Sequence, residues 1–125
     1  CCQSFGRKLL DQGSGSIINI ASIGAFISYP HASAYNASKG AVLNLTRVLA
    51  LEWIDRGVRV NGIAPGLCDS PLTRARAKQS SVTSDFLEAR MLRPEVILPR
   101  ELVGAAVFLA QPVVDRAHIE EQQAL

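Results

Sequence analysis

Tyr35 and Lys39 are the residues of this 125-residue sequence whose types and spacing most directly suggest chemistry. Four residues apart on a helix, they would share one face, one turn from each other. A phenol has an unperturbed pKa of about 10, and an ammonium about 4 Å away favours a phenolate by on the order of 4 kcal/mol at an effective dielectric of about 20. No acidic residue stands three or four positions from Lys39. The pair could therefore serve as a general acid and base, although a half-buried tyrosine beside a solvated lysine would give the same spacing.

Ser22 and the pair Pro65-Gly66 follow two apolar runs in which β-branched residues are frequent, 17–21 and 58–64. Such runs indicate strands, the first of the kind that is buried on both faces of a parallel sheet, and proline cannot continue a central strand. In open α/β sheets the ligand crevice lies outside the carboxyl ends of the strands. We therefore expect these residues to meet Tyr35 in one crevice. A serine that ends a strand through a local hydrogen bond and an ordinary turn are the plain structural alternatives.

Three amphipathic segments are expected to position these residues. Apolar side chains recur at helical spacing over 2–12, from 34 to about 55 and over 99–110, and glycines at 13 and 57 stop the first two. Residues 70–99 are rich in Ser, Thr, Arg and Pro and predict a functional loop region with short helical turns at 72–78 and 84–91. Strand, long helix, strand and helix in this order favour a parallel sheet. The predicted fold class is α/β.

The composition narrows the classes of function. A hydrophobic content of 48% with 19% charged residues fits a folded segment. Thirteen Lys and Arg against eleven Asp and Glu are scattered, so no nucleic-acid partner is expected. No apolar run approaches the roughly 18–20 residues that cross a membrane, so no membrane span is expected. The three cysteines have neither disulfide nor metal-ligand spacing, so we expect no metal site and a reducing, cytoplasmic setting.

Taken together, the motifs resemble those of the short-chain dehydrogenase/reductase family. The resemblance rests on Ile20-Ala21-Ser22, Tyr35-Asn36-Ala37-Ser38-Lys39 and Asn61-Gly62-Ile63-Ala64-Pro65-Gly66. It runs from about Gly13 to Ala110, and the separation of thirteen residues between Ser22 and Tyr35 matches the usual spacing of the family.

The fold that the resemblance implies is a Rossmann-type doubly wound parallel sheet. Residues 1–110 would be the carboxyl-terminal, catalytic part of that domain, and 111–125 a divergent polar tail. The phosphate-binding βαβ half of the family, with the residues that choose between NAD and NADP, would precede Cys1. The last strand of the family is not recognisable, so we expect a partial sheet.

The resemblance also implies roles for individual residues. Tyr35 would be the general acid and base, and Lys39 would make its phenol more acidic and bind the nicotinamide ribose. Ser22 would orient the substrate oxygen, and Pro65-Gly66 would contact the nicotinamide, as would Ser70, which stands where the family often has threonine. The expected activity is hydride transfer between NAD or NADP and a small secondary alcohol or ketone, whose identity the sequence does not indicate.

A second hypothesis is open on the same residues. The helices expected at 2–12 and 34–55 correspond to those through which the family forms dimers and tetramers, so a homo-oligomer is expected. A truncated, inactive product could use the same helices to associate with intact subunits, and the single tryptophan, Trp53, and the stripe of Leu45 and Leu49 motivate this alternative.

Overall fold

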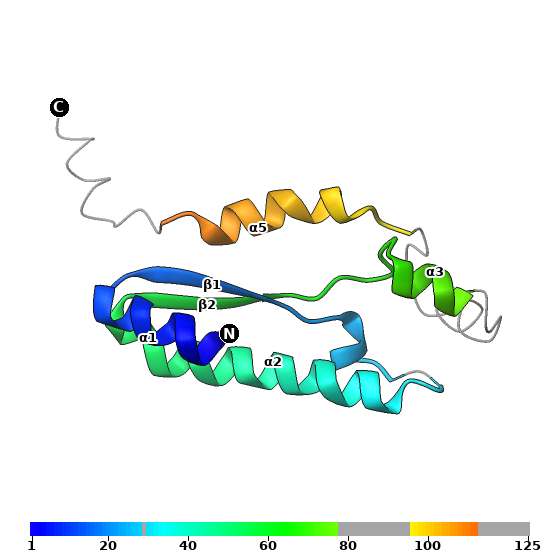
Figure 1. Cartoon of the computed structure of the whole chain (residues 1–125), viewed down its shortest axis with the longest axis horizontal. Coiled ribbons are helices and arrows are strands. Elements are labelled where there is room, and N and C mark those ends of the chain that lie inside the picture. The colour runs from blue at the N-terminus through cyan, green and yellow to red at the C-terminus, as the bar shows by residue number, and fades with distance from the viewer. Residues whose placement is uncertain (29, 78–95, 113–125) are drawn as a thin grey trace.

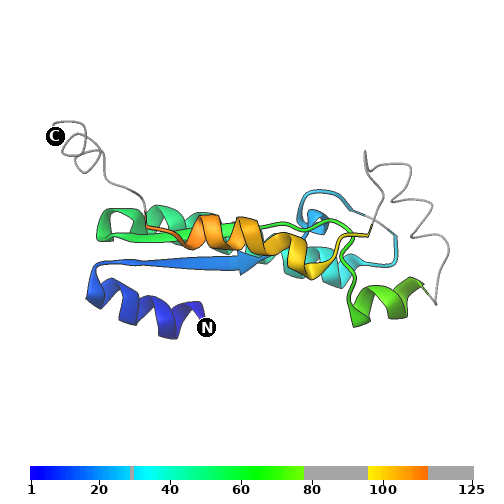
Figure 2. The same ribbon diagram turned by 90° about the horizontal axis from the view of Figure 1, so that it is seen from above.

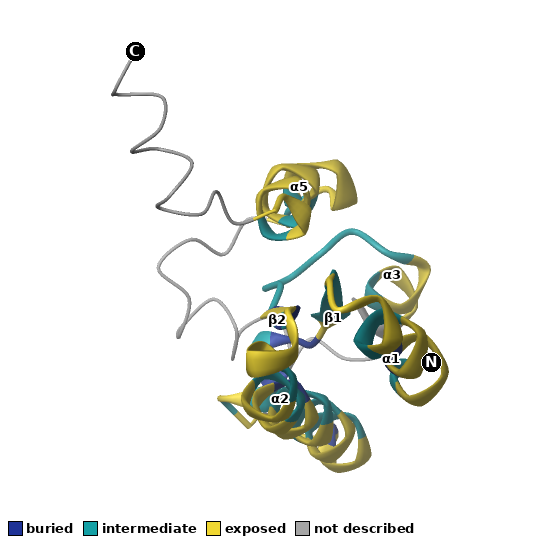
Figure 3. Ribbon diagram, turned by 90° about the vertical axis from the view of Figure 1, so that its left-hand side faces the viewer, coloured by how far each residue is buried: buried dark blue, intermediate teal, exposed yellow. Residues whose placement is uncertain are grey.

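The computed structural model describes residues 1–28, 30–77 and 96–112. Two strands lie between helices, as Figures 1 and 3 show. In chain order the described elements are α1 (Cys2–Gln12), β1 (Gly15–Ile20), η1 (Ile23–Ala25), α2 (Ser33–Trp53), η2 (Ile54–Arg56), β2 (Val58–Ile63), α3 (Pro71–Ala77), η3 (Pro99–Leu102) and α5 (Val103–Ala110).

β1 and β2 form a parallel pair in the described part of the chain. The register runs from Gly15 opposite Val58 to Ile20 opposite Ile63. Helices α1 and α2 cover one face of the pair, and α5 covers the other (Figure 3). The α/β class predicted from the sequence is confirmed, because the long helix α2 returns the chain from the end of one strand to the start of the next.

The burial of β1 differs from the prediction. We expected this strand to be buried on both faces, yet its residues are half-buried and Ile20 is 50% exposed. β2 carries most of the core, with Val58, Val60 and Ile63 buried. Within the described residues β1 pairs only with β2, so its other edge has no neighbouring strand to exclude solvent.

The predicted helices are present with small shifts at their ends. Gly13 ends α1 with φ of 68°, and Gly57 ends the short helix after α2 with φ of 75°, so both glycines adopt the left-handed conformation that favours this residue. The last predicted helix begins as the 3-10 turn η3 and continues as α5. α3 confirms the turn expected from residue 72, whereas the turn expected at 84–91 and the tail from 113 lie outside the described residues.

Helix α5 is fixed to the sheet by side chains from both strands. The guanidinium of Arg59 donates to the carbonyl oxygens of Leu109, at 2.9 Å, and Gln111, at 2.6 Å. The hydroxyl of Ser16 also donates to Leu109 O, at 2.9 Å. These bonds satisfy carbonyls that a helix end leaves unpaired, and they hold the α5 layer in place.

α3 lies beyond the carboxyl ends of the strands, as Figures 1 and 2 both show. Among the described helices, none combines the length and the apolar character that a membrane crossing requires.

Candidate active site

Helix α2 brings Tyr35 and Lys39 to the carboxyl end of β1. Nζ of Lys39 lies 6.0 Å from the centroid of the Tyr35 ring. The same ammonium donates a hydrogen bond to the carbonyl oxygen of Ile20, the last residue of β1, at 2.9 Å. The two side chains therefore share one helix face, as their spacing predicts, and the lysine is tied to the strand end that precedes Ser22.

Ser22 is buried at the start of η1, with 6% of its surface exposed. Its Oγ accepts a hydrogen bond from the backbone N–H of Gly24 at 3.1 Å. This is the local bond that a strand-ending serine commonly makes. Because the hydroxyl oxygen accepts here, its O–H can still donate to another oxygen.

Pro65 lies beside the residue that follows Ser22. Pairing of the two chains continues past the strands, since Ala21 N–H donates to Ile63 O at 2.8 Å and Ile23 N–H donates to Pro65 O at 3.0 Å. Gly66 comes next and is half-buried. The expected meeting of the two strand ends is therefore present in the structure.

Ser70 directly precedes α3. Its Oγ accepts the N–H of Thr73 at 3.1 Å and lies 2.9 Å from the Thr73 hydroxyl oxygen. This is the geometry of a helix N-cap. The loop before it pairs with Ile97, whose carbonyl accepts from Asp69 N–H at 2.8 Å, so the chain after residue 96 returns beside this loop.

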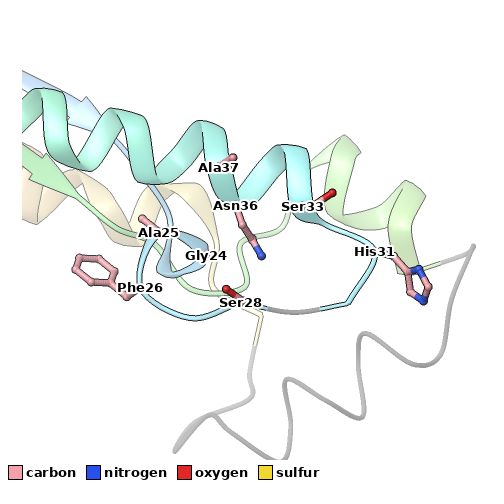
Figure 4. A pocket seen from close by; sticks show the side chains of 8 residues that line it. All are labelled: Gly24, Ala25, Phe26, Ser28, His31, Ser33, Asn36 and Ala37. Carbon is pink, nitrogen blue, oxygen red and sulfur yellow. The ribbon is translucent and has the colours of Figure 1, made fainter.

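A pocket of about 510 Å³ opens between η1, the following loop and the first turns of α2 (Figure 4). Asn36, which directly follows Tyr35, lines it together with Ser28, His31 and Ser33. The Oδ1 atom of Asn36 is buried and has no hydrogen-bond partner within the described residues. Asn36 lies inside the Tyr35–Lys39 motif without a predicted role, and its place next to Tyr35 is the one sequence signal that could have singled it out.

Comparison with known proteins gives the chain a family. A family model of the short-chain dehydrogenases, described as Enoyl-(Acyl carrier protein) reductase, matches residues 1–117. The chain belongs to the short-chain dehydrogenase/reductase family. The resemblance inferred from the three motifs is thereby confirmed.

The relatives of this short-chain dehydrogenase/reductase chain include enzymes of alcohol and polyol oxidation. A 2-(R)-hydroxypropyl-CoM dehydrogenase of Xanthobacter autotrophicus is 37% identical over 109 residues, which are 87% of this chain and 43% of the relative. A galactitol 2-dehydrogenase (L-tagatose-forming) of Cereibacter sphaeroides is 40% identical over 112 residues, 88% of this chain and 44% of the relative.

Solved structures agree with this assignment. A gluconate 5-dehydrogenase from Burkholderia cenocepacia, in complex with NADP and tartrate, has a TM-score of 0.79 to this chain and is 36% identical. The match covers 89% of this chain and 43% of that one. The chain therefore spans less than half the length of these members of the family, and its structure corresponds to part of a short-chain dehydrogenase fold.

Proposed function

We propose that this chain is the catalytic part of an NAD- or NADP-dependent oxidoreductase that interconverts a secondary alcohol and a ketone. The observation that carries the proposal is the contact of Lys39 with both the Tyr35 ring and the end of β1, next to the buried Ser22. The family supports the same proposal, because the relatives include dehydrogenases and a related solved structure, the gluconate 5-dehydrogenase from Burkholderia cenocepacia, contains NADP.

Each residue has a role that its surroundings support. Tyr35 takes the hydroxyl proton from an alcohol, or returns it to a ketone, and the Lys39 ammonium stabilises the phenolate that forms. Ser22 donates a hydrogen bond to the substrate oxygen, which positions that oxygen and stabilises negative charge on it. The nicotinamide, when bound, supplies the hydride acceptor or donor.

The residues present fit such a cofactor. Lys39 offers an ammonium at the strand end, which can donate to ribose hydroxyls as well as to the Ile20 carbonyl. Pro65-Gly66 places half-buried backbone beside the same strand end, where a flat ring can lie against it. Ser70 lies four residues further on, with its hydroxyl engaged in the α3 cap, so a contact with the nicotinamide requires this hydroxyl to serve both partners.

Hydride transfer can be tested with the purified full-length product that contains this chain. Incubation with NAD or NADP and secondary alcohols should produce reduced nicotinamide, and deuterium on the carbinol carbon should be transferred to the nicotinamide ring. The absence of deuterium transfer with every alcohol and ketone of a broad panel would refute the proposal.

For the substrate, we propose a molecule rich in hydroxyl groups. The pocket between η1 and the first turns of α2 combines the polar groups of Ser28, His31, Ser33 and Asn36 with Phe26 and small residues, and its lining carries no carboxylate or ammonium. The buried Asn36 Oδ1 has no donor among the described residues. Related proteins act on galactitol and gluconate. The variant Asn36→Ala should therefore raise KM for polyols at least fivefold while leaving KM for a small monohydric alcohol within twofold, and equal effects on both would contradict this substrate class.

The oligomeric state forms a separate proposal, a homo-oligomer through residues 2–12 and 34–55. Large apolar side chains are exposed on α1 and along α2 and η2: Phe5, Leu45, Val48, Leu51 and Ile54. Several large exposed apolar side chains that recur along one helical segment, as Leu45, Val48, Leu51 and Ile54 do, favour a protein interface.

A further inference from the structure

A polar cluster lies where α2 crosses the sheet, away from the groups assigned to the reaction. The side-chain amide of Asn19, on β1, donates from Nδ2 to the hydroxyl oxygen of Thr46 at 3.0 Å. Thr46 in turn donates to the carbonyl oxygen of Val42 at 2.8 Å. Thr46 is 7% exposed, and it and Ser22 are the two buried polar side chains of the described residues.

Gly62 on β2 lies next to Thr46. It is the residue paired with Asn19 across the sheet. A Cβ atom at this glycine would lie 3.5 Å from Cγ2 of Thr46, which is an ordinary van der Waals contact. Thr46 therefore rests directly on the Asn19–Gly62 pair, and its hydroxyl meets the amide at close range.

Thr46 and Lys39 attach the same face of α2 to β1 at two points. They are seven residues apart, which is about two turns or roughly 10.5 Å along the helix axis. Lys39 is bonded to Ile20 and Thr46 to Asn19, which are adjacent residues of β1. Two attachments on one face fix both the position of α2 along its axis and its rotation about it.

A slip of α2 would break these attachments. Nδ2 of Asn19 would then lose its acceptor, whereas Thr46 would keep its bond to Val42 within the helix, and leaving a part-buried donor unpaired is unfavourable. Hydrophobic packing alone does not select a register so sharply, because apolar contacts are non-directional. The hydrogen bond is thus the part of the interface that distinguishes one helix position from its neighbours.

We infer that Asn19 and Thr46 are positioning residues, which hold α2 in the register that brings Tyr35 and Lys39 to the end of β1. The side-chain hydrogen bonds of Asn19 and Thr46 within the described part of the chain go to Cys2, Val42 and each other, so both residues would act through α2. The catalytic consequence rests on the proposed function, whereas the placement of the Tyr35 ring is independent of it.

The test compares Thr46→Val with Thr46→Ser in the full-length product. Valine keeps the shape and loses the hydroxyl, so kcat should fall tenfold or more and the pH midpoint of alcohol oxidation should move upward by at least half a unit. Serine keeps the hydroxyl. In Thr46→Ser, kcat should therefore stay within threefold of the wild type, and the pH midpoint should stay within 0.2 units of it. An unchanged pH profile in Thr46→Val would overturn the inference.

Two further variants separate positioning from stability. Gly6→Ala is the control, because a Cβ at Gly6 would collide with the Trp53 ring, far along α2 from Lys39, and should lower stability without moving the pH profile. If Thr46→Val does not fold, Asn19→Ala is the milder change, since Thr46 keeps its bond to Val42, and the same shift is expected. Equal effects of Gly6→Ala and Asn19→Ala on the profile would contradict a positioning role.

A readout without catalysis distinguishes this inference from the proposed function. The ring carbons of labelled tyrosine, with Tyr35 identified by Tyr35→Phe, should show a changed NMR signal for Tyr35 in Thr46→Val and an unchanged one in Gly6→Ala. An inactive wild-type enzyme would refute the proposed function, and an unmoved Tyr35 signal would refute the positioning role.

Discussion

Lys39 connects the Tyr35 ring, on α2, with the end of β1. Its ammonium is held by the Ile20 carbonyl at the end of β1 and stands over the Tyr35 ring, so its charge has a fixed place beside the phenol. A flexible lysine would have lost side-chain entropy on reaching this position during the reaction, and the bond to the strand removes that cost beforehand. The same bond explains why the lysine is found at the strand end rather than extended into solvent.

Replacement of Lys39 tests this role. In Lys39→Met the positive charge beside the Tyr35 ring is lost, so negative charge on the phenol oxygen is no longer stabilised and kcat of alcohol oxidation should fall at least tenfold. The measurement is kcat with saturating cofactor. A wild-type kcat in Lys39→Met would mean that the charge of Lys39 does not act on Tyr35.

The sequence predicts residues whose signals are local and misses those whose signals are not. The shared helix face of Tyr35 and Lys39 and the place of Ser22 after a strand could be predicted, because a helical spacing and a strand end are visible within a few positions. The bond between Asn19 and Thr46 joins residues 27 positions apart, and no spacing rule covers such a contact. The Oδ1 atom of Asn36, which has no hydrogen-bond partner among the described residues, likewise could not be singled out from the sequence, because its burial depends on the fold around the start of α2.

The helices and strands can be predicted because their apolar spacing and the residues at their ends both favour the structure that is found. α1 ends at Gly13 and the helical segment after α2 ends at Gly57, where the left-handed backbone needs glycine. The burial of β1 was not predictable, because an apolar strand looks the same in sequence whether or not a neighbour pairs with its second edge. Its Ile20 is half exposed for that reason.

Two glycine-to-alanine substitutions test the elements around the sheet, Gly57→Ala at the turn before β2 and Gly40→Ala inside α2. A Cβ at Gly57 would collide with the carbonyl oxygen of Gly13, and its φ of 75° strains any other residue. Gly57→Ala should therefore lower the free energy of unfolding by about 1–3 kcal/mol. Gly40 lies inside α2 with nothing within 4 Å of its Cβ position, so Gly40→Ala should raise that free energy by about 0.5–1 kcal/mol.

Urea unfolding of the full-length product, followed by circular dichroism, measures both changes. Destabilisation by Gly40→Ala would show that α2 is packed more closely at this point than the described residues indicate. A neutral Gly57→Ala would contradict the turn that joins α2 to β2.

At the scale of the whole molecule, the apolar content exceeds what the described part buries. The buried hydrophobic residues are Ala21, Ala32, Val58, Val60 and Ile63, whereas Phe5, Leu51 and Phe108 are each more than 60% exposed. The chain also spans about 44% of the length of its relatives. As a proposal, two kinds of protein surface would cover these side chains: the parts of a short-chain dehydrogenase domain outside the matched 44%, and a second subunit.

Leu51 tests the second of these covers. It is 79% exposed on α2, so Leu51→Glu should leave folding intact and shift the full-length product from oligomer toward monomer in light scattering after size exclusion. Asn44→Glu adds the same charge at an exposed polar position of α2 and serves as the control. An oligomer unaffected by Leu51→Glu would exclude this face. Recovery of the isolated chain in a complex with an intact homologue, without activity of its own, would favour the alternative of an associating, inactive product.

The rate of hydride transfer in Tyr35→Phe, set against Tyr29→Phe, tests the central claim most directly. Each variant removes one phenolic hydroxyl, and the chain has two tyrosines, so the two variants replace them one at a time. A general acid and base contributes roughly 10²–10⁴-fold, so Tyr35→Phe should lose at least a hundredfold in kcat with unchanged unfolding, while Tyr29→Phe stays within threefold of the wild type. Equal rates for Tyr35→Phe and the wild type would contradict the account.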